Sequence, residues 1–390
     1  IRFRVPCTQI AVAGMHSEGH PAMKMPETDE GVIAKRSNLV GRFRKFLSEE
    51  SVINDHDELK VYETDGLTAY HQLPMIVVLP DTTAQVAKIL KICTSEGVKV
   101  VPRGAGTGLS GGALPLADGV TVGLAKFNRI LDIDYGNRTA TVQTGVTNLA
   151  ITQAVEAKGF YYAPDPSSQI ACTIGGNVAE NSGGVHCLKY GLTVHNILSV
   201  EMITAEGDRV TVGNDALDAC GMDLLALMTG SEGLLGIVTK VKVKLLPKPE
   251  IAQVVMAGFD SVQKAGDAVG GIISHGIIPG GLEMMDGHAI IAADDFAQAG
   301  YPREAKALLL CEVDGTEEEV HEHIEQAENV FRKLGATSVK TSQSEEERAL
   351  LWKGRKSAFP AVGRISPDYY CMDGTIPRRH LAHVLLEMER

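Results

Sequence analysis

The stretch Val101–Ala113 reads V-P-R-G-A-G-T-G-L-S-G-G-A and places five glycines within nine residues. Glycine adopts positive φ freely, lets another backbone or a ligand approach closely, and loses much conformational entropy on folding. Val98–Val101, just before the loop, reads as a short buried strand. A strand that leads into such a loop predicts a nest of backbone N–H groups for phosphate oxygens. A flexible linker would instead be Ser-rich and would lack hydrophobic strands on both sides.

The residues after the loop decide which kind of phosphate loop it is. Gly106–Gly111 fits G-x-G-x-x-G, but a Rossmann loop must open a helix. Here Pro115 and the pair Asp118-Gly119 break any helix, and Val120–Leu124 reads as a second strand. The loop therefore joins strand to strand and offers its amides to the pyrophosphate of a dinucleotide. Gly-Lys-Ser/Thr does not occur in it, which excludes a P-loop NTPase.

Composition limits the class of protein. A chain of 390 residues exceeds one typical domain, and its net charge of −12 argues against a nucleic-acid or anionic-membrane surface. No apolar run reaches the roughly 18 residues of a membrane span. The cysteines are odd in number and form no C-x-x-C pair, which favours buried free thiols in a reducing compartment. They are Cys7, Cys93, Cys172, Cys187, Cys220, Cys311 and Cys371.

Residues 41–249 are expected to form one α+β domain. Met75–Leu79 reads as a buried strand, and Thr82-x-x-Gln85 predicts a capping box for a helix that ends at Gly97. Together with Val98–Pro102 they form a βαβ unit. Further strands are expected at Thr139–Gln143, Ile197–Thr204, Arg209–Val212 and Ile237–Leu245, and a helix at Leu149–Lys158. Residues 1–40 stay unassigned, and both ends of the chain are expected to be cut or unprocessed.

Residues 250–390 follow a different pattern and are expected to form a smaller cap domain. The expected order is βαββαβ, which is the ferredoxin-like split motif. Its strands are Gln253–Phe259, Gly280–Met285, Lys306–Val313 and Ala336–Lys340, and its helices are Ser261–His275 and Thr316–Leu334. A further helix is expected at Ser344–Ala358. The chain is thus predicted to be a glycine-rich nucleotide domain followed by a ferredoxin-like α+β cap.

Two more glycine-rich pieces accompany the first loop. Pro164–Ser168 is a turn rich in hydroxyl groups, and Cys172–Gly184 holds two Gly-Gly pairs with two asparagines between them. Gly230–Val238 is the third piece. Each piece alone is consistent with tight turns. Three pieces at strand ends in one domain favour a bound nucleotide.

These motifs resemble the FAD-binding domain of vanillyl-alcohol-oxidase-type flavoproteins, the PCMH type, and above all the family of FAD-binding D subunits of bacterial glycolate oxidases, with D-lactate dehydrogenases near it. The resemblance runs from about Asp65 to Pro377. It is also carried by His186–His195, Ile277–Asp286 and Ala358–Arg378. It implies a two-part FAD-binding domain followed by the cap.

The resemblance implies non-covalent FAD, because the glycine loop carries no His of the kind to which some relatives link the flavin. The first piece would hold the pyrophosphate, the second would line the flavin and ribose, and the third would pack on the adenine side. The cofactor-binding residues expected on this basis are Arg103, Gly104, Ala105, Gly106, Thr107, Gly108, Leu109, Ser110, Gly111, Pro164, Asp165, Ser167, Thr173, Gly175, Gly176, Asn177, Asn181, Glu232, Gly233, Gly236, Ile237 and Val238.

A 2-hydroxy acid needs a cation for its carboxylate, a base for its hydroxyl and a flavin N5 to accept the C2 hydride. Arg355 offers a bidentate fork to a carboxylate, and Trp352–Arg355 resembles the W-x-x-R substrate motif of the family. The alternative is a surface Arg on a charged helix. Tyr370 and Arg364 are weaker candidates for the substrate pocket.

Full-length members of that family carry H-x-G-D-G-N-x-H and a later G-E-H-G, which bind a divalent metal and supply the catalytic His. This chain stops before both motifs. We therefore expect the catalytic residue and any metal site to lie outside it, the cap to be incomplete, and the chain to be inactive alone. His321-Glu322-His323 does not fit H-E-x-x-H, and residues two apart on a helix face different ways, so a solvated helix face is expected there.

The favoured hypothesis is FAD-dependent oxidation of a small 2-hydroxy acid, glycolate or D-lactate, with electrons passed to another subunit or acceptor. The alternatives are a flavin-binding electron-transfer subunit without its own turnover and a same-fold synthase such as an ether-lipid synthase. The resemblance implies a second flavin-domain subunit and an iron–sulfur subunit as partners, no nucleic acid, and a cytoplasmic location or a peripheral one at the inner membrane. One methyl group changes binding by only about 1–3 kcal/mol, so the sequence does not separate glycolate from D-lactate.

Overall fold

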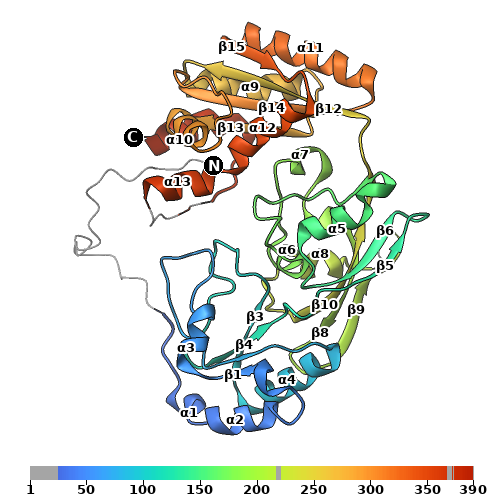
Figure 1. The fold of residues 1–390 in the computed structure, drawn as a ribbon, viewed down its shortest axis with the longest axis vertical. Coiled ribbons are helices and arrows are strands. Elements are labelled where there is room, and N and C mark those ends of the chain that lie inside the picture. Colours follow the sequence, from blue (N-terminus) through green and yellow to red (C-terminus); the bar gives the residue numbers. More distant parts are fainter. Residues whose placement is uncertain (1–24, 217–220, 367–370, 372, 390) are drawn as a thin grey trace. The chain divides into compact units, whose positions relative to one another are not determined.

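The computed structural model describes residues 25–216, 221–366, 371 and 373–389 (Figure 1). It divides into two compact units. Within the described residues, the N-terminal unit comprises 25–184 and 191–248, and the C-terminal unit comprises 185–190 and the residues from Pro249 onward. The chain passes between the units next to the expected Pro249 boundary. The chain also enters the C-terminal unit at Val185 and leaves it after Tyr190, a segment that was predicted to lie inside the first domain.

The first sheet of the N-terminal unit has the order β1-β2-β4-β3, and β2 and β3 both run parallel to β4. Its strands are β1 (Val52–Ile53), β2 (Ile76–Val78), β3 (Lys99–Arg103) and β4 (Gly119–Gly123). Helix α4 (Thr83–Glu96) begins with the predicted capping box of Thr82 and Gln85 and ends at Gly97, whose φ is 67°. Residues 104–118 contain no helix, so the glycine loop joins β3 to β4 as predicted.

Residues before position 41 also belong to this unit. Helices α1 (Glu30–Ile33) and α2 (Arg36–Phe43) precede the first strand. Leu39 and Phe43 are fully buried in the same hydrophobic cluster as Ile76 of the sheet. The segment that was left unassigned, residues 1–40, is therefore too long. Its last part contributes to the hydrophobic core of this unit. The short helix α3 (His56–Leu59) follows β1.

The second sheet of this unit is antiparallel and has the order β5-β6-β10-β8-β9. Its strands are β5 (Ile130–Asp134), β6 (Thr139–Gln143), β8 (Ile197–Ile203), β9 (Arg209–Gly213) and β10 (Ile237–Lys244). The helices are α5 (Asn148–Val155), α6 (Ile174–Glu180) and α8 (Leu224–Met228), and β7 (Phe160–Tyr161) pairs with β11 (Leu246–Pro247). The predicted helix over Leu149–Lys158 is α-helical only to Val155 and continues as a 3₁₀ turn to Lys158.

The C-terminal unit has the predicted ferredoxin-like topology, with the sheet order β13-β14-β12-β15 and every neighbouring pair antiparallel. Its strands are β12 (Ile251–Phe259), β13 (Gly281–Asp286), β14 (Ala307–Gly315) and β15 (Ala336–Thr341). Its helices are α7 (Cys187–Tyr190), α9 (Val262–Ser274), α10 (Gly287–Ala297), α11 (Glu317–Lys333), α12 (Glu345–Lys356), α13 (Ala358–Ile365) and α14 (Leu381–Glu389). Helix α10 was not expected, because in the predicted order β14 follows β13 directly.

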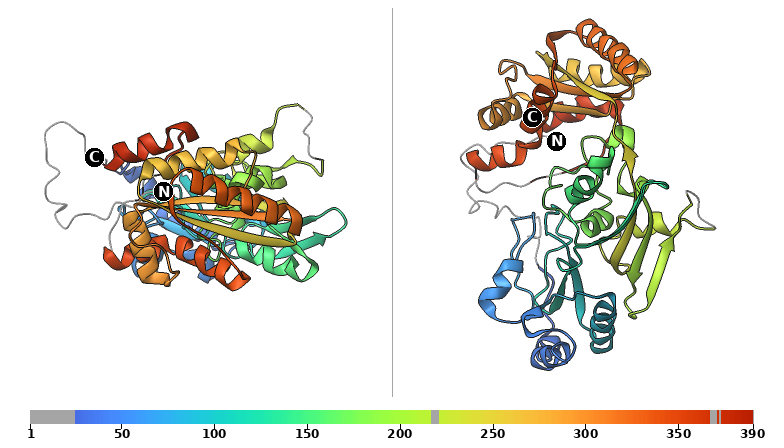
Figure 2. Two further views of the ribbon diagram at one scale, coloured as in Figure 1. Left: turned by 90° about the horizontal axis from the view of Figure 1, so that it is seen from above. Right: turned by 45° about the vertical axis from the view of Figure 1, so that its right-hand side comes forward.

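Both faces of this sheet are covered, as Figures 1 and 2 show. Helices α9 and α11 pack on one face, where Phe259 and Leu309 belong to their hydrophobic cluster. Helices α10 and α12 pack on the other face, where Met256 and Leu310 belong to a second cluster. Because side chains alternate along a strand, this face also receives the even-numbered residues of β14. Two of those residues are acidic.

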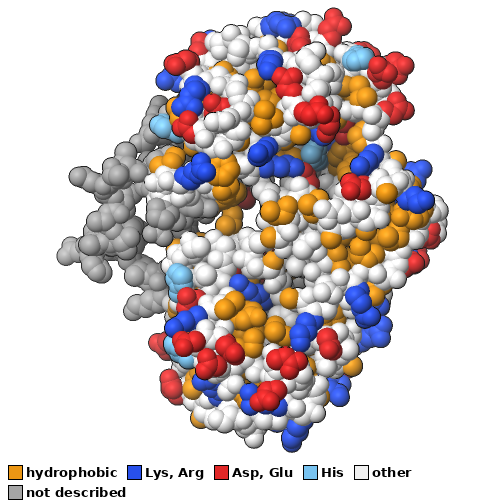
Figure 3. Space-filling view, viewed as in Figure 1, with side chains coloured by type: hydrophobic (Ala, Val, Ile, Leu, Met, Phe, Trp, Pro, Cys, Tyr) orange, Lys and Arg blue, Asp and Glu red, His pale blue; other side chains and the backbone are white. Residues whose placement is uncertain are grey.

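Charged side chains of both signs are interspersed over the face drawn in Figure 3. In the part of the chain that the structure describes, no helix combines the length and apolar character needed to cross a bilayer.

Candidate functional site

The glycine loop presents a row of backbone donors. Across the described residues, no backbone N–H from Gly104 to Gly112 donates a hydrogen bond to another protein group. Gly106 and Gly111 have φ of 70° and 82°, the left-handed region in which successive N–H groups turn toward one side. Backbone donors without a protein partner are satisfied by water or by an anionic ligand. The loop therefore fits the phosphate nest predicted from the sequence.

Arg103 supplies the cation at the start of this loop. Its guanidinium lies over the Tyr62 ring, 5.8 Å from the centroid, and donates to the carbonyl of Ala113 at 3.2 Å. Asp65 supports the other end, because its buried carboxylate accepts hydrogen bonds from the N–H groups of Leu67 and Ala113. Tyr62 and Asp65 were not among the predicted site residues. Of these two residues only Asp65 had a signal in the sequence, because the dipeptide Asp65-Gly66 is typical of turns.

The second piece meets the first at Gly104. A β-carbon on Gly104 would overlap the hydroxyl of Thr173 and lie 3.7 Å from its β-carbon. Thr173 is buried and is the N-cap of α6, where its hydroxyl accepts a hydrogen bond from Gly176 N–H at 3.3 Å. Gly175 lies as close to Thr144, with 2.7 Å between an ideal β-carbon and the threonine β-carbon. Two of the predicted glycines are thus explained by close backbone approach.

A buried chain of amides holds the rest of the second piece. Asn148 Nδ2 donates to Asn177 Oδ1 at 3.0 Å and to the carbonyl of Pro164 at 2.9 Å. Asn177 Nδ2 in turn donates to Cys172 Sγ at 3.3 Å. The side chain of Asn181 accepts from Val194 N–H at 3.0 Å. The two predicted asparagines therefore have protein partners, and they fix the backbone of this piece.

The turn around Asp165 lies against the end of the same piece. A β-carbon on Gly184 would overlap the Asp165 carbonyl, so the second Gly-Gly pair is required for this approach. Asp165 and Pro164 are buried, whereas Ser167 is exposed. The turn and the residues that begin and end α6 therefore form one contiguous wall.

The third piece joins the other two. Gly230 and Glu232 donate backbone hydrogen bonds to the carbonyls of Val178 and Ala179 in α6, at 2.8 and 2.9 Å. Gly233 has φ 78° and packs so closely on Pro102 of β3 that a β-carbon would overlap that ring. The three glycine-rich pieces predicted as one constellation do meet.

The last residues predicted in this piece lie in the core. Gly236 is buried, and Ile237 and Val238 begin β10 with buried side chains in two hydrophobic clusters. Ile237 and Val238 are also paired with β8 in the sheet, so their predicted role beside the nucleotide stays a prediction.

Carboxylates limit which part of a nucleotide fits beside the loop. A β-carbon on Gly112 would lie 3.0 Å from Glu180 Oε1 and 3.3 Å from Glu232 Oε2. Partial desolvation beside the loop, and then repulsion by Glu232 and Asp65, raise the pKa of Glu180. Carboxylates repel phosphates but accept hydrogen bonds from sugar hydroxyls. The loop amides and Arg103 thus suit a diphosphate, and Glu180 and Glu232 suit the hydroxyl groups beside it.

Arg355 lies in the C-terminal unit, and it is not a surface residue. It is 5% exposed, near the end of α12, and its Nη2 donates to Glu283 Oε2 of β13 at 2.7 Å. Its Nε–H is buried and has no hydrogen-bond partner among the described residues. A buried donor without an acceptor is costly, so the guanidinium is suited to an additional acceptor such as a carboxylate. The alternative of a solvated arginine is wrong.

The weaker substrate candidates are less favourably placed. Arg364 is exposed on α13, and its guanidinium lies over the ring of Phe296, 4.5 Å from the centroid. Tyr370 lies outside the described residues. Among the residues that the structure describes, no three His, Cys, Asp or Glu side chains are close enough together to hold a metal ion.

Comparison with known proteins identifies the class that this fold and site define. Residues 74–213 match the family model described as FAD binding domain, and residues 248–390 match the model described as FAD linked oxidases, C-terminal domain. The chain is therefore an FAD-linked oxidoreductase, and its expected cofactor is confirmed.

The relatives narrow this class. The chain is 60% identical over 350 residues to the glycolate oxidase subunit GlcD of Escherichia coli K12, covering 90% of this chain and 70% of the relative. It is 43% identical to GlcD of Bacillus subtilis, covering 83% and 69%, and 30% identical to a D-lactate dehydrogenase of Anaerostipes hadrus, covering 89% and 74%. The chain belongs to the family of FAD-linked oxidases that contains these GlcD subunits.

Solved structures confirm the fold. p-Cresol methylhydroxylase superposes with a TM-score of 0.71 at 19% identity, covering 87% of this chain and 73% of that one. Alkyldihydroxyacetonephosphate synthase gives 0.69 at 19% identity, covering 88% and 67%. At this identity the likeness extends to the fold alone. It is the two-part FAD-binding architecture with a cap that was predicted.

Proposed function

We propose that this chain, extended through the two motifs expected to supply the catalytic His, oxidises a small 2-hydroxy acid, glycolate or D-lactate, to the 2-oxo acid. FAD, when bound, supplies the acceptor for the hydride that leaves C2, while the hydroxyl proton passes to a base. Glycolate oxidase and D-lactate dehydrogenase are the names of similar proteins, and the substrates that they name share a carboxylate next to a secondary or primary alcohol. The proposed class of substrate follows from that shared chemistry.

The observation that carries the proposal is the buried guanidinium of Arg355 with its unpartnered Nε–H. A carboxylate bound there would accept from Nε and from a terminal nitrogen in a bidentate arrangement. Glu283 accepts from Nη2, which carries two N–H groups, so Nε–H and the second N–H of Nη2 can serve a ligand. Arg355 would therefore orient the acid, and its charge would offset that of the carboxylate in a desolvated site.

The chain's own residues would hold FAD through backbone groups for the most part. The N–H groups of Gly104–Gly112 and the guanidinium of Arg103 would bind the diphosphate. Thr173 and the turn around Asp165 would line the flavin side, with the amides of Asn148 and Asn177 keeping that wall rigid. Rigid backbone donors bind with little loss of conformational freedom, which suits a tightly held cofactor.

We propose that electrons leave through further subunits, because the similar GlcD proteins are named as subunits of an oxidase. A second flavin-domain subunit and an iron–sulfur subunit are the partners proposed. The proposed location is the cytoplasm, or the inner membrane surface through those partners.

The test is anaerobic reduction of the FAD-loaded full-length protein, extended through the two motifs that are expected to supply the catalytic His. Glycolate or D-lactate should bleach the flavin absorbance, and Arg355→Lys should lower kcat/KM by roughly 10- to 150-fold, because a point charge replaces the planar fork. Lys353→Met is the matched control, since Lys353 is an exposed cation on the same helix. FAD content should stay equal in all three proteins.

A protein that holds FAD but is reduced by neither acid would instead be an electron-transfer subunit. Equal kcat/KM in the parent and Arg355→Lys would leave Arg364 as the next cation to test.

A further inference from the structure

One face of the C-terminal sheet carries three acidic residues close together. Glu312 and Asp314 are two apart on β14, and Gly281, which is paired with Glu312, is two residues from Glu283 on β13. Side chains two apart share a face, so all three point to the side covered by α12. Glu312 is 2% exposed and Asp314 is 7% exposed. Buried carboxylates are costly unless each one is paired, so their partners determine how this face is organised.

Helix α12 provides partners from successive turns of one face. Arg348, Trp352 and Arg355 follow the spacing i, i+4, i+7. Arg348 Nη1 lies 2.6 Å from Glu312 Oε2, and the indole N–H of Trp352 donates to the same oxygen. Arg355 donates to Glu283 on the neighbouring strand. The sheet therefore fixes this helix through one carboxylate near its middle and another near its end.

Glycine opposite Glu312 makes this arrangement sterically feasible. A β-carbon on Gly281 would lie 3.1 Å from two carbons of the Trp352 ring. A side chain at position 281 would therefore press on the indole, and the ring would have to shift by a few tenths of an ångström. Trp352 is 5% exposed and packs with Leu310 and Leu351 in the hydrophobic cluster of this face. Its position is set by packing as well as by the hydrogen bond to Glu312.

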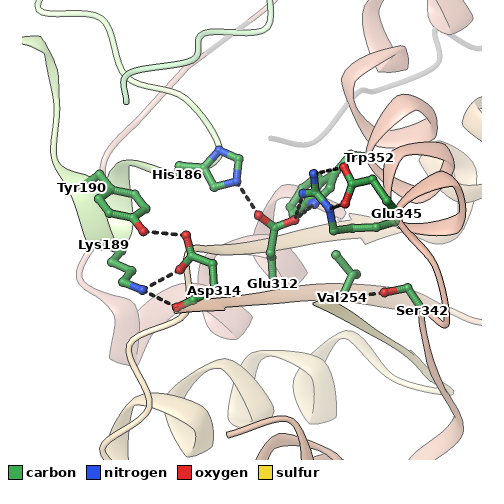
Figure 4. Close-up of polar contacts among 10 residues, drawn as sticks. His186, Lys189, Tyr190, Val254, Glu312, Asp314, Ser342, Glu345 and Trp352 are labelled. Carbon is green, nitrogen blue, oxygen red and sulfur yellow. Dashed lines mark hydrogen bonds and ion pairs between the residues drawn. The ribbon is translucent and has the colours of Figure 1, made fainter. Parts of the chain in front are cut away.

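The fourth partner of this network comes from another part of the sequence. His186 Nε2 lies 2.8 Å from Glu312 Oε1, and its ring lies 5.9 Å from that of Trp352 (Figure 4). His186 belongs to Val185–Tyr190, the segment that leaves the N-terminal unit at Gly184 and returns to it at Gly191. From the same segment, Lys189 and Tyr190 bind Asp314 at 2.5 Å each (Figure 4). Glu312 is therefore the acid shared by this segment and α12, whereas Asp314 binds Lys189 and Tyr190 of the segment.

Glu312 is held in its charged form. Burial raises the pKa of this carboxyl, but the hydrogen bonds and charges of His186 and Arg348 outweigh burial and leave the pKa below its usual value. A charged carboxylate accepts from all three donors, whereas a glutamine would turn an NH2 group toward one of them. The charge of Glu312 is thus required for the geometry of α12.

We infer that Glu312 is a positioning residue for substrate binding, because it fixes helix α12 and thereby the guanidinium of Arg355. This inference rests on the proposed function, in which Arg355 binds the substrate carboxylate. A bidentate contact depends on placement within a fraction of an ångström. Loosening α12 at Arg348 and Trp352 should therefore weaken carboxylate binding without removing any group that touches the substrate.

The test compares Glu312→Gln with Asp314→Asn in the same FAD-loaded full-length protein. Asp314 is the matched control, since it lies on the same strand and face and binds Lys189 and Tyr190 of the same segment, which are not part of α12. For Glu312→Gln we expect KM to rise roughly tenfold while kcat changes less than about threefold, as loss of binding rather than of chemistry predicts. The Kd of oxalate, a dicarboxylate without a C–H bond from which a hydride could leave, should rise in parallel. FAD content should be unchanged, and Asp314→Asn should leave KM within about twofold of the parent.

Two results would overturn the inference: a lower kcat with an unchanged KM, or equal rises of KM in both variants. If Glu312→Gln does not fold, Trp352→Phe replaces it, because that change removes one donor to Glu312 and keeps an aromatic ring. It should raise KM by a smaller factor, and an unchanged KM would count against the inference. A parent protein that neither oxidises the acids nor binds oxalate refutes the proposed function. A parent that does both, with unchanged KM in the variants, refutes only the role of Glu312.

Discussion

Gly104→Ala tests whether the glycine loop and α6 approach each other as closely as the structure has them. The new methyl group would overlap the hydroxyl of Thr173, a stiff β-branched residue that is only 7% exposed. Either the loop moves or Thr173 rotates away from Gly176 N–H, which it caps at 3.3 Å. Overpacking costs typically about 1–3 kcal/mol, and a lost N-cap about 0.5–2 kcal/mol. We expect the free energy of unfolding to fall by about 2–3 kcal/mol.

A double-mutant cycle separates the clash from other effects. Thr173→Ala alone removes the cap and should cost about 1 kcal/mol. Added to Gly104→Ala, it also removes the overlapping hydroxyl, so the double variant should cost about as much as Thr173→Ala by itself. The coupling energy would then have a magnitude of about 2–3 kcal/mol, well above the few tenths found for independent sites. Gly176→Ala is the matched control, since its β-carbon would lie 3.5 Å from the same hydroxyl, an ordinary contact.

The assay is urea unfolding of FAD-free protein followed by circular dichroism, together with titration of FAD into each variant. Gly104→Ala should weaken FAD binding by roughly tenfold or more, because about 1.4 kcal/mol of displaced loop contacts corresponds to that factor. If the double variant loses as much stability as the two single changes added together, the reasoning about this contact is refuted. The same holds if Gly104→Ala binds FAD as tightly as the parent protein.

Two further predictions concern the flavin loop and acid stability. Gly106→Val should abolish FAD binding more than it harms the fold. The φ of 70° at this position disfavours a β-branched residue, and a β-carbon would overlap the Arg103 guanidinium. Equal FAD content of the variant and the parent after gel filtration would contradict the loop assignment. Glu312 has a lowered pKa in the folded chain, so the folded state binds fewer protons there than the unfolded state, and its stabilisation is present above the usual glutamate pKa and lost as pH falls through the lowered one. Glu312→Gln should therefore cost about 3–5 kcal/mol at neutral pH and show a flatter decline of melting temperature with acid than the parent; parallel curves would mean that Glu312 is not charged in the folded protein.

Local signals in the sequence were sufficient to predict most of the individual helices and strands. The capping box of Thr82 and Gln85, and Gly97 at the end of α4, depend on backbone groups a few residues apart, and such groups make the same bonds in any fold. Helix α10 was missed because its N-cap, Asp286, also ends a strand. The order of strands and helices after Pro249 was sufficient for the ferredoxin-like topology, since few arrangements obey the handedness of its connections.

The sequence by itself predicted the nucleotide site. Three glycine-rich pieces in one domain indicate that backbones approach each other or a ligand closely. Only the tertiary structure decided how charged groups are paired. Nothing local in the sequence places His186 beside Glu312, 126 residues away, or distinguishes a buried Arg355 from a solvated one. These pairings come from long-range packing. A carboxylate on a buried strand needs hydrogen-bond donors, and the helices and segments that cover the strand supply them.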